Sequence, residues 1–184
     1  MNSKNIAVSA VSASLIAVFL ILGAYITVLD ISSVVIASLF TLIPLYKKNY
    51  LGAFLCFLAG GVIAFMCYGF NPITLVFPSF FAFFGIYPIV STKMLEKGVK
   101  VAILYVIGII WCVAVCYGLY FYYTLFMGLN LHNMPLWVMN NIYYILAPVA
   151  IAVYFVFELF IRFGKRFLFY YLSKIIKWLK RTTF

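Results

Sequence analysis

Long apolar stretches separated by short polar ones run through almost the whole chain. Six of them approach or exceed the length of a membrane-spanning helix, at residues 6–28, 31–46, 51–70, 73–90, 101–127 and 137–161. Such a helix needs about 20 mainly apolar residues, within a range of about 17–25, and the second stretch is slightly short of that. The pattern therefore predicts an all-α fold, a polytopic membrane helix bundle with six transmembrane helices.

Three positions predict local detail in this bundle. Only Leu29 and Asp30 separate the first two stretches, so we expect Asp30 to lie in a very tight outer turn, inside a helical hairpin. Pro78 falls in the middle of the fourth stretch, which also carries Pro88. It should kink that helix or break its hydrogen bonding, because proline has no backbone N–H. The first stretch is longer than the ~7–15 apolar residues of a signal peptide, so we expect it to stay in the protein.

The last part of the chain has a different pattern. Residues 163–184 alternate cations with large apolar side chains, and on a helix the two kinds gather on opposite sides. This predicts a C-terminal amphipathic interfacial helix that lies on anionic lipids, attached to a transmembrane domain at residues 1–162. A docking helix for a cytoplasmic partner is the other interpretation.

The composition indicates that the solvent of this fold is lipid. Of 184 residues, 68% are hydrophobic and 9% are charged, whereas soluble domains have about 45–50% apolar and about 25% charged residues. A water-soluble fold of this length could not bury so much apolar surface. The lipid bilayer is therefore the first predicted partner.

The basic residues predict the orientation of the bundle. If the six stretches alternate in direction, all thirteen lysines and arginines fall on one side: at Lys4, at 47–48, at 93–100 and from Arg162 onward. Basic loops stay on the cytoplasmic side, so we expect a multi-pass protein of the cell (plasma) membrane with both termini in the cytoplasm. The net charge of +10 would suggest nucleic-acid binding in a soluble protein. Its placement at the ends of apolar stretches argues against that class.

The apolar stretches contain almost no groups for catalysis or ion transport, which usually leave ionisable residues inside the spans. Glu158 lies near the inner end of the sixth stretch, and we expect it to pair with Arg162 at i,i+4. No motif of a zinc protease, a serine hydrolase or an ATPase is present. Cys112 and Cys116 share a helix face without a further ligand, so packing is the favoured interpretation. We expect no enzyme, no cofactor and no metal site.

Polar residues that map to the outer ends of helices are the candidates for binding a substrate. They are Asp30, Asn71, His132, Asn140, Asn141 and Tyr144. Amides at the start of an apolar helix are costly unless they are hydrogen-bonded. Asn140 and Asn141 could therefore cap the sixth helix, or they could line an outward-facing pocket for a small ligand.

Small residues repeat every four positions along the first stretch, at Ser9, Ala13 and Ala17. A stripe of this kind lets another helix approach closely. Ordinary packing inside the bundle is one interpretation, and docking of a separate membrane subunit is the other.

Taken together, the size, the six predicted helices and the stripe with Ala13 and Ala17 resemble the substrate-binding S components of energy-coupling factor (ECF) transporters. The resemblance implies that Ser9, Ala13 and Ala17 dock on a membrane scaffold subunit, that separate ATPases hydrolyse ATP, and that a small solute such as a vitamin binds on the outer side. Residues 83–90, with Lys93 and Glu96, also resemble small uncharacterised membrane proteins of Firmicutes, which implies a bacterial source.

Two hypotheses for the function follow. The first is an S component-like, substrate-binding subunit of an ECF-type importer. The second is a non-enzymatic structural or regulatory membrane protein that assembles with other membrane proteins through its small-residue faces and basic tail. The first hypothesis alone predicts uptake of a solute.

Overall fold

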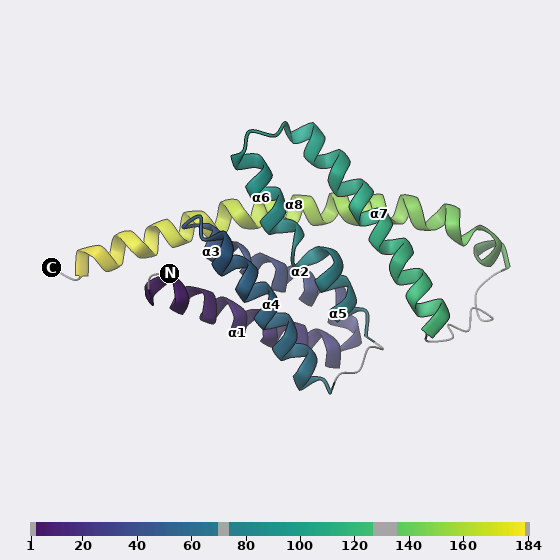
Figure 1. The fold of residues 1–184 in the computed structure, drawn as a ribbon, viewed down its shortest axis with the longest axis horizontal. Helices are drawn as coiled ribbons and strands as arrows, with labels where there is room; N and C mark the ends of the chain where they lie inside the picture. The colour runs from purple at the N-terminus through teal and green to yellow at the C-terminus, as the bar shows by residue number, and fades with distance from the viewer. Residues whose placement is uncertain (1–2, 70–73, 127–135, 183–184) are drawn as a thin grey trace.

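A computed structural model of the chain describes residues 3–69, 74–126 and 136–182, which form helices joined by turns, with no strand in these ranges. The long helices are α1 (Ser3–Tyr25), α4 (Tyr50–Cys67), α7 (Val101–Phe126) and α8 (Leu136–Thr182). The shorter elements are η1 (Thr27–Leu29), α2 (Asp30–Phe40), α3 (Leu42–Leu45), α5 (Val76–Ser79), η2 (Phe80–Phe84) and α6 (Tyr87–Glu96). The two chain ends lie on the same side of the bundle (Figure 1).

The lengths and compositions of the helices fit a membrane protein. Five stretches are long and apolar enough to cross a bilayer: Asn5–Tyr25, Tyr50–Cys67, Val76–Glu96, Val101–Leu125 and Asn141–Lys174. A further apolar stretch, Asp30–Leu45, is shorter and reaches only about 24 Å at ~1.5 Å per residue, against a hydrocarbon core of about 30 Å. The predicted all-helical, multi-pass architecture is therefore confirmed, with five to six spans.

The first two predicted stretches form a hairpin around a tight turn, as expected at Asp30. The turn is the single 3₁₀ turn η1, in which the N–H of Leu29 donates to the carbonyl of Ile26 at 2.8 Å. Asp30 then begins α2. The two helices pack so closely that a side chain at Gly23 would overlap Ser33. The hairpin thus holds Asp30 beside the end of α1.

The fourth stretch is interrupted, as its prolines predict, but the interruption follows Pro78 by several residues. The fourth stretch divides into α5, which contains Pro78, the π-type segment η2, and α6, which has Pro88 in its first turn. The N–H of Gly85 donates to the carbonyl of Phe80 at 2.8 Å, which is the wider i→i+5 spacing of a π turn. Because Pro88 has no N–H to give to the preceding turn, the α-helical ladder cannot run through this region.

α8 is longer than the sixth predicted stretch. It runs unbroken from Leu136 to Thr182, so that the predicted span and the predicted tail form one helix (Figure 1). At ~1.5 Å per residue its 47 residues measure about 70 Å, more than twice the thickness of the hydrocarbon core. Residues 163–182 continue α8 without a break, and the predicted position of this part on the membrane surface stays a prediction.

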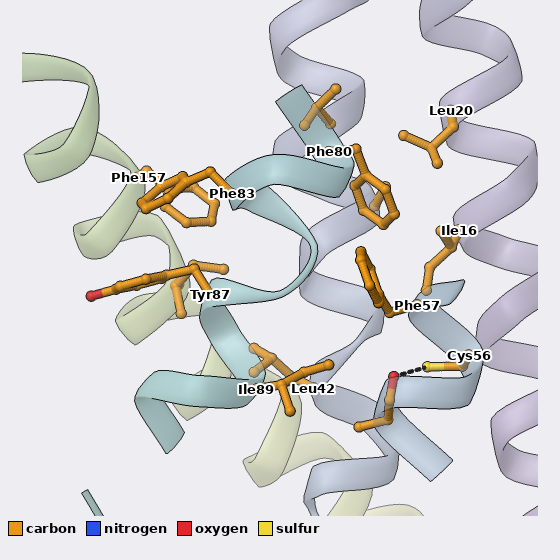
Figure 2. Packing of buried hydrophobic residues seen from close by; sticks show 14 of the residues in the cluster. Ile16, Leu20, Leu42, Cys56, Phe57, Phe80, Phe83, Tyr87, Ile89 and Phe157 are labelled. Atoms are coloured by element: carbon orange, nitrogen blue, oxygen red, sulfur yellow. Dashed lines mark hydrogen bonds between the residues drawn. The ribbon is translucent and has the colours of Figure 1, made fainter. Parts of the chain in front are cut away.

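The core of the bundle is mostly aromatic and aliphatic. Phe57 of α4 lies against Phe80 of η2, with ring centroids 5.4 Å apart, and next to Ile16 of α1 (Figure 2). On the other side of η2, Phe83 and Tyr87 face Phe157 of α8. The broken helix therefore lies between the α1–α4 pair and α8, and it contributes side chains to both contacts.

Candidate functional site

A cavity of about 150 Å³ lies between α2, α5, η2, α7 and α8. Its walls are almost entirely apolar, and the aromatic part comes from Phe83 and Phe84 of η2. The π turn positions these rings, because it moves the chain out of the α-helical path just after Pro78. The interrupted helix predicted from the prolines thus forms one wall of the cavity.

Asp30 is the one charged residue among the described residues that line this cavity. Its Oδ1 atom is buried and has no hydrogen-bond partner in the described structure. As the first residue of α2, it lies where the helix dipole favours a negative charge. A buried carboxylate oxygen without a donor is costly, and the position of Asp30 on the cavity wall makes it available to a bound molecule.

Two other polar groups on the wall, those of Ser79 and Cys112, already use their hydrogens. The hydroxyl of Ser79 donates to carbonyls of its own helical turn, those of Leu75 and Val76. The thiol of Cys112 donates to the carbonyl of Ala150 on α8 at 3.5 Å. Cys116 lies one turn further along α7 on the same wall. No group of three or more metal-ligating side chains exists within the described ranges.

A second hollow adjoins the cavity. It is an apolar groove of about 390 Å³ between α2 and α8, and it shares Ile31, Phe84 and Val153 with the cavity. Ligand pockets in proteins typically measure about 300–1,000 Å³. The cavity and the groove together provide that amount of space.

Of the predicted substrate-binding residues that the structure describes, only Asp30 lies at the cavity. Asp30 lines the cavity, while Asn71 and His132, as well as the side chain of Asn140, lie outside the described residues. The Nδ2 of Asn141 donates to the carbonyl of Trp137 at 2.9 Å on the outside of α8. Tyr144 is 80% exposed. Neither residue lines the cavity or the groove.

The small-residue stripe of α1 is buried inside the chain. Ser9, Ala13 and Ala17 face α4, and each is no more than 7% exposed. A side-chain carbon at Gly60 would lie 2.8 Å from the carbonyl of Ala13, so the helices can pack this closely only because Gly60 has no side chain. In this structure the stripe packs inside the chain, as the packing interpretation expects. Docking of a separate subunit on the same stripe stays a prediction, and it would require α4 to move away.

Four residues of α6 and α8 form a polar cluster, namely Tyr87, Tyr154, Glu158 and Arg162; the first three are buried, and Arg162 is exposed at its edge. The hydroxyl of Tyr87 donates to Glu158 Oε2 at 2.9 Å and lies 2.8 Å from the hydroxyl of Tyr154. Arg162 Nε donates to Glu158 Oε1 at 2.8 Å, which confirms the expected i,i+4 pair. The guanidinium of Arg162 also lies over the ring of Tyr105, 4.7 Å from its centroid.

The polar cluster attaches α6 to α8 through hydrogen bonds. Both oxygens of Glu158 accept a hydrogen bond, and its side chain is 4% exposed. Each oxygen of this carboxylate therefore already has a donor within the chain, whereas Oδ1 of Asp30 on the cavity wall has none in the described structure. We therefore take the cavity, and not the polar cluster, as the candidate site.

Comparisons with known proteins add no relative. No family model matches the chain, and neither a curated protein nor a solved structure matches it.

Several lining residues are absent from the predicted site residues. The sequence favours packing for Cys112 and Cys116, and it marks Phe83 and Phe84 only as part of a resemblance, yet all four line the cavity. The signal that could have located them is Pro78, because a broken helix leaves space beside its break.

Proposed function

We propose that this chain is the solute-binding membrane subunit of an importer, similar to an ECF S component, and that its partners are a membrane scaffold subunit and ATPases. The cavity between α2, α5, η2, α7 and α8 carries this proposal. Binding sites in helical membrane proteins occur between helices, often where a helix is interrupted. The proposed role is binding, without catalysis.

The charge distribution supports a cavity that opens to the outside. With the thirteen basic residues on the cytoplasmic side, α2 starts at the outer surface at Asp30 and runs inward. Cavity residues such as Val115 and Leu119 then belong to the outer half of α7, which runs outward from Val101. The proposed location is the plasma membrane of a bacterium, with both termini in the cytoplasm.

An uptake experiment tests the proposal even while the identity of the solute is open. Cells that express the wild-type chain, and cells that lack it, are grown in the same medium, and the small molecules removed from the medium are compared by mass spectrometry. We expect at least one solute to be taken up only when the chain is present. Substituting Val115→Phe should fill the cavity and abolish that uptake.

A matched substitution on the same helix controls for general damage. Ile110 is 64% exposed on α7, so Ile110→Phe adds the same ring on the surface of the bundle, outside the cavity, and should leave uptake unchanged. Equal solute profiles with and without the chain would contradict the proposal. They would leave the second hypothesis, a membrane protein that only assembles with others.

Co-purification tests the predicted partners. The chain, tagged and expressed at native level, should bring a scaffold subunit and ATPases with it in mild detergent. Ala13→Leu would be a poor docking variant, because Ala13 is buried against α4. Ala10→Leu changes an exposed position of the same helix, so it tests docking with less damage to the fold. Purification of the chain alone would contradict the importer proposal.

A further inference from the structure

The described cavity lining offers hydrogen-bond acceptors and a negative charge, but no positive charge. Asp30 contributes a carboxylate, and Ser79 contributes the lone pairs of a hydroxyl whose hydrogen is already used. None of the lysines and arginines appears among the described lining residues. An anionic solute would therefore enter without a donor for its charge, at a large desolvation cost.

The unpartnered Oδ1 of Asp30 defines the missing group. This atom is buried and receives no hydrogen bond within the described structure. A donor on the solute would satisfy it, and a positively charged donor would do so most strongly, since hydrogen bonds between ionised groups are about twice as strong as neutral ones. The group that fits Asp30 is an ammonium or a similar cationic N–H.

The apolar walls and the volume of the cavity indicate the polarity and the size of the rest of the solute. Apolar walls of about 150 Å³ can hold a body of about the size of benzene, which binds in an apolar protein cavity of that volume. Phe83 and Phe84 add aromatic rings to the lining of the same cavity, and aromatic faces attract cations. Size, polarity and charge thus point to the same class of molecule.

We infer that the cavity binds a small organic cation, with one ammonium group on an apolar body, and that Asp30 receives the ammonium. This inference rests on the proposed solute-binding function and narrows the class of solute. A vitamin or metabolite that carries only carboxylates is excluded from this cavity by the same argument.

Three probes of one shape test the inference: benzylammonium, benzyl alcohol and benzoate. Their dissociation constants for the full chain are measured by calorimetry in nanodiscs of zwitterionic lipid, with empty nanodiscs as the blank. We expect benzylammonium to bind at least about tenfold more tightly than benzyl alcohol, and benzoate to bind most weakly. Because this comparison uses the wild-type chain, it holds even if a variant fails to fold.

Substitution of the carboxylate identifies its role. Asp30→Asn keeps the shape and removes the charge, so benzylammonium and benzyl alcohol should then bind about equally. Glu96→Gln is the matched control, because Glu96 is an exposed acid at the end of α6, away from the cavity lining. It should keep the full preference for benzylammonium.

The outcomes separate the two proposals. Equal binding of the three probes, or a preference for benzoate, would overturn the assignment of a cationic solute and leave the cavity as a binding site. A preference for benzylammonium that survives in Asp30→Asn would overturn the role of Asp30. No binding of any probe would overturn both this inference and the cavity as the basis of the proposed function.

Discussion

Replacing Tyr87 by phenylalanine removes a single oxygen atom from the centre of the polar cluster. Tyr87 is 2% exposed, so water cannot replace the lost group. The substitution removes the donor to Glu158 Oε2 and the partner of the Tyr154 hydroxyl. The aromatic packing of the ring against Phe83 and Phe157 remains in place, so the change isolates the hydrogen bonds.

The cost can be estimated from the two contacts. A hydrogen bond to a charged group contributes about 1.5–3 kcal/mol, and hydrogen bonds between side chains in membrane proteins contribute about 0.6 kcal/mol on average. We therefore expect Tyr87→Phe to lower the free energy of unfolding by roughly 2–3.5 kcal/mol. For a chain of this length that corresponds to a fall in melting temperature of about 4–14 °C.

The assay is thermal unfolding in detergent, followed by size-exclusion chromatography of the heated samples. Tyr144→Phe is the matched control, because Tyr144 is 80% exposed on the same helix as Glu158, and its melting temperature should stay within about 2 °C of the wild type. A Tyr87→Phe variant as stable as the control would refute the argument that the polar cluster attaches α6 to α8.

Two further predictions concern α7 and the ends of α4 and α6. Gly108→Ala should destabilise the chain by about 1–3 kcal/mol, because a side-chain carbon there would overlap Tyr154, whereas Gly118→Ala meets no atom within 4 Å and should be neutral or slightly stabilising in thermal unfolding. Cys67 is the exposed cysteine at the end of α4. In a variant whose other cysteines are replaced by alanine, a membrane-impermeant maleimide should label Cys67 on intact cells. When Cys67 is also replaced and Lys97→Cys is introduced, the new cysteine should be labelled only after the cells are permeabilised. The reverse pattern would contradict the proposed orientation.

The sequence predicted the parts of the fold that depend on local pattern. Apolar length located the helices, Asp30 located the tight turn, and the two prolines of the fourth stretch indicated an interruption, because each effect acts within one or two helical turns. The i,i+4 pair of Glu158 and Arg162 is confirmed for the same reason.

The parts that depend on contacts between distant segments were not predictable. Tyr87 and Glu158 are 71 positions apart, and no periodicity in one chain indicates that they meet. The choice between packing and docking for Ala13 likewise depended on which helix lies next to it, and the structure shows α4 there. For the candidate site, Asp30 was selected because it is a polar residue at the outer end of a predicted helix, whereas the walls of its cavity also come from four other segments.

The unbroken course of α8 has a mechanical consequence. The helix contributes Val153 to the wall of the cavity and continues to Thr182, about 44 Å further along its axis. A continuous helix behaves as a lever, so a tilt of about 5° at Val153 would move the far end by about 4 Å. When a solute enters or leaves the cavity, a small tilt of α8 would therefore move its C-terminal end by about the length of a side chain.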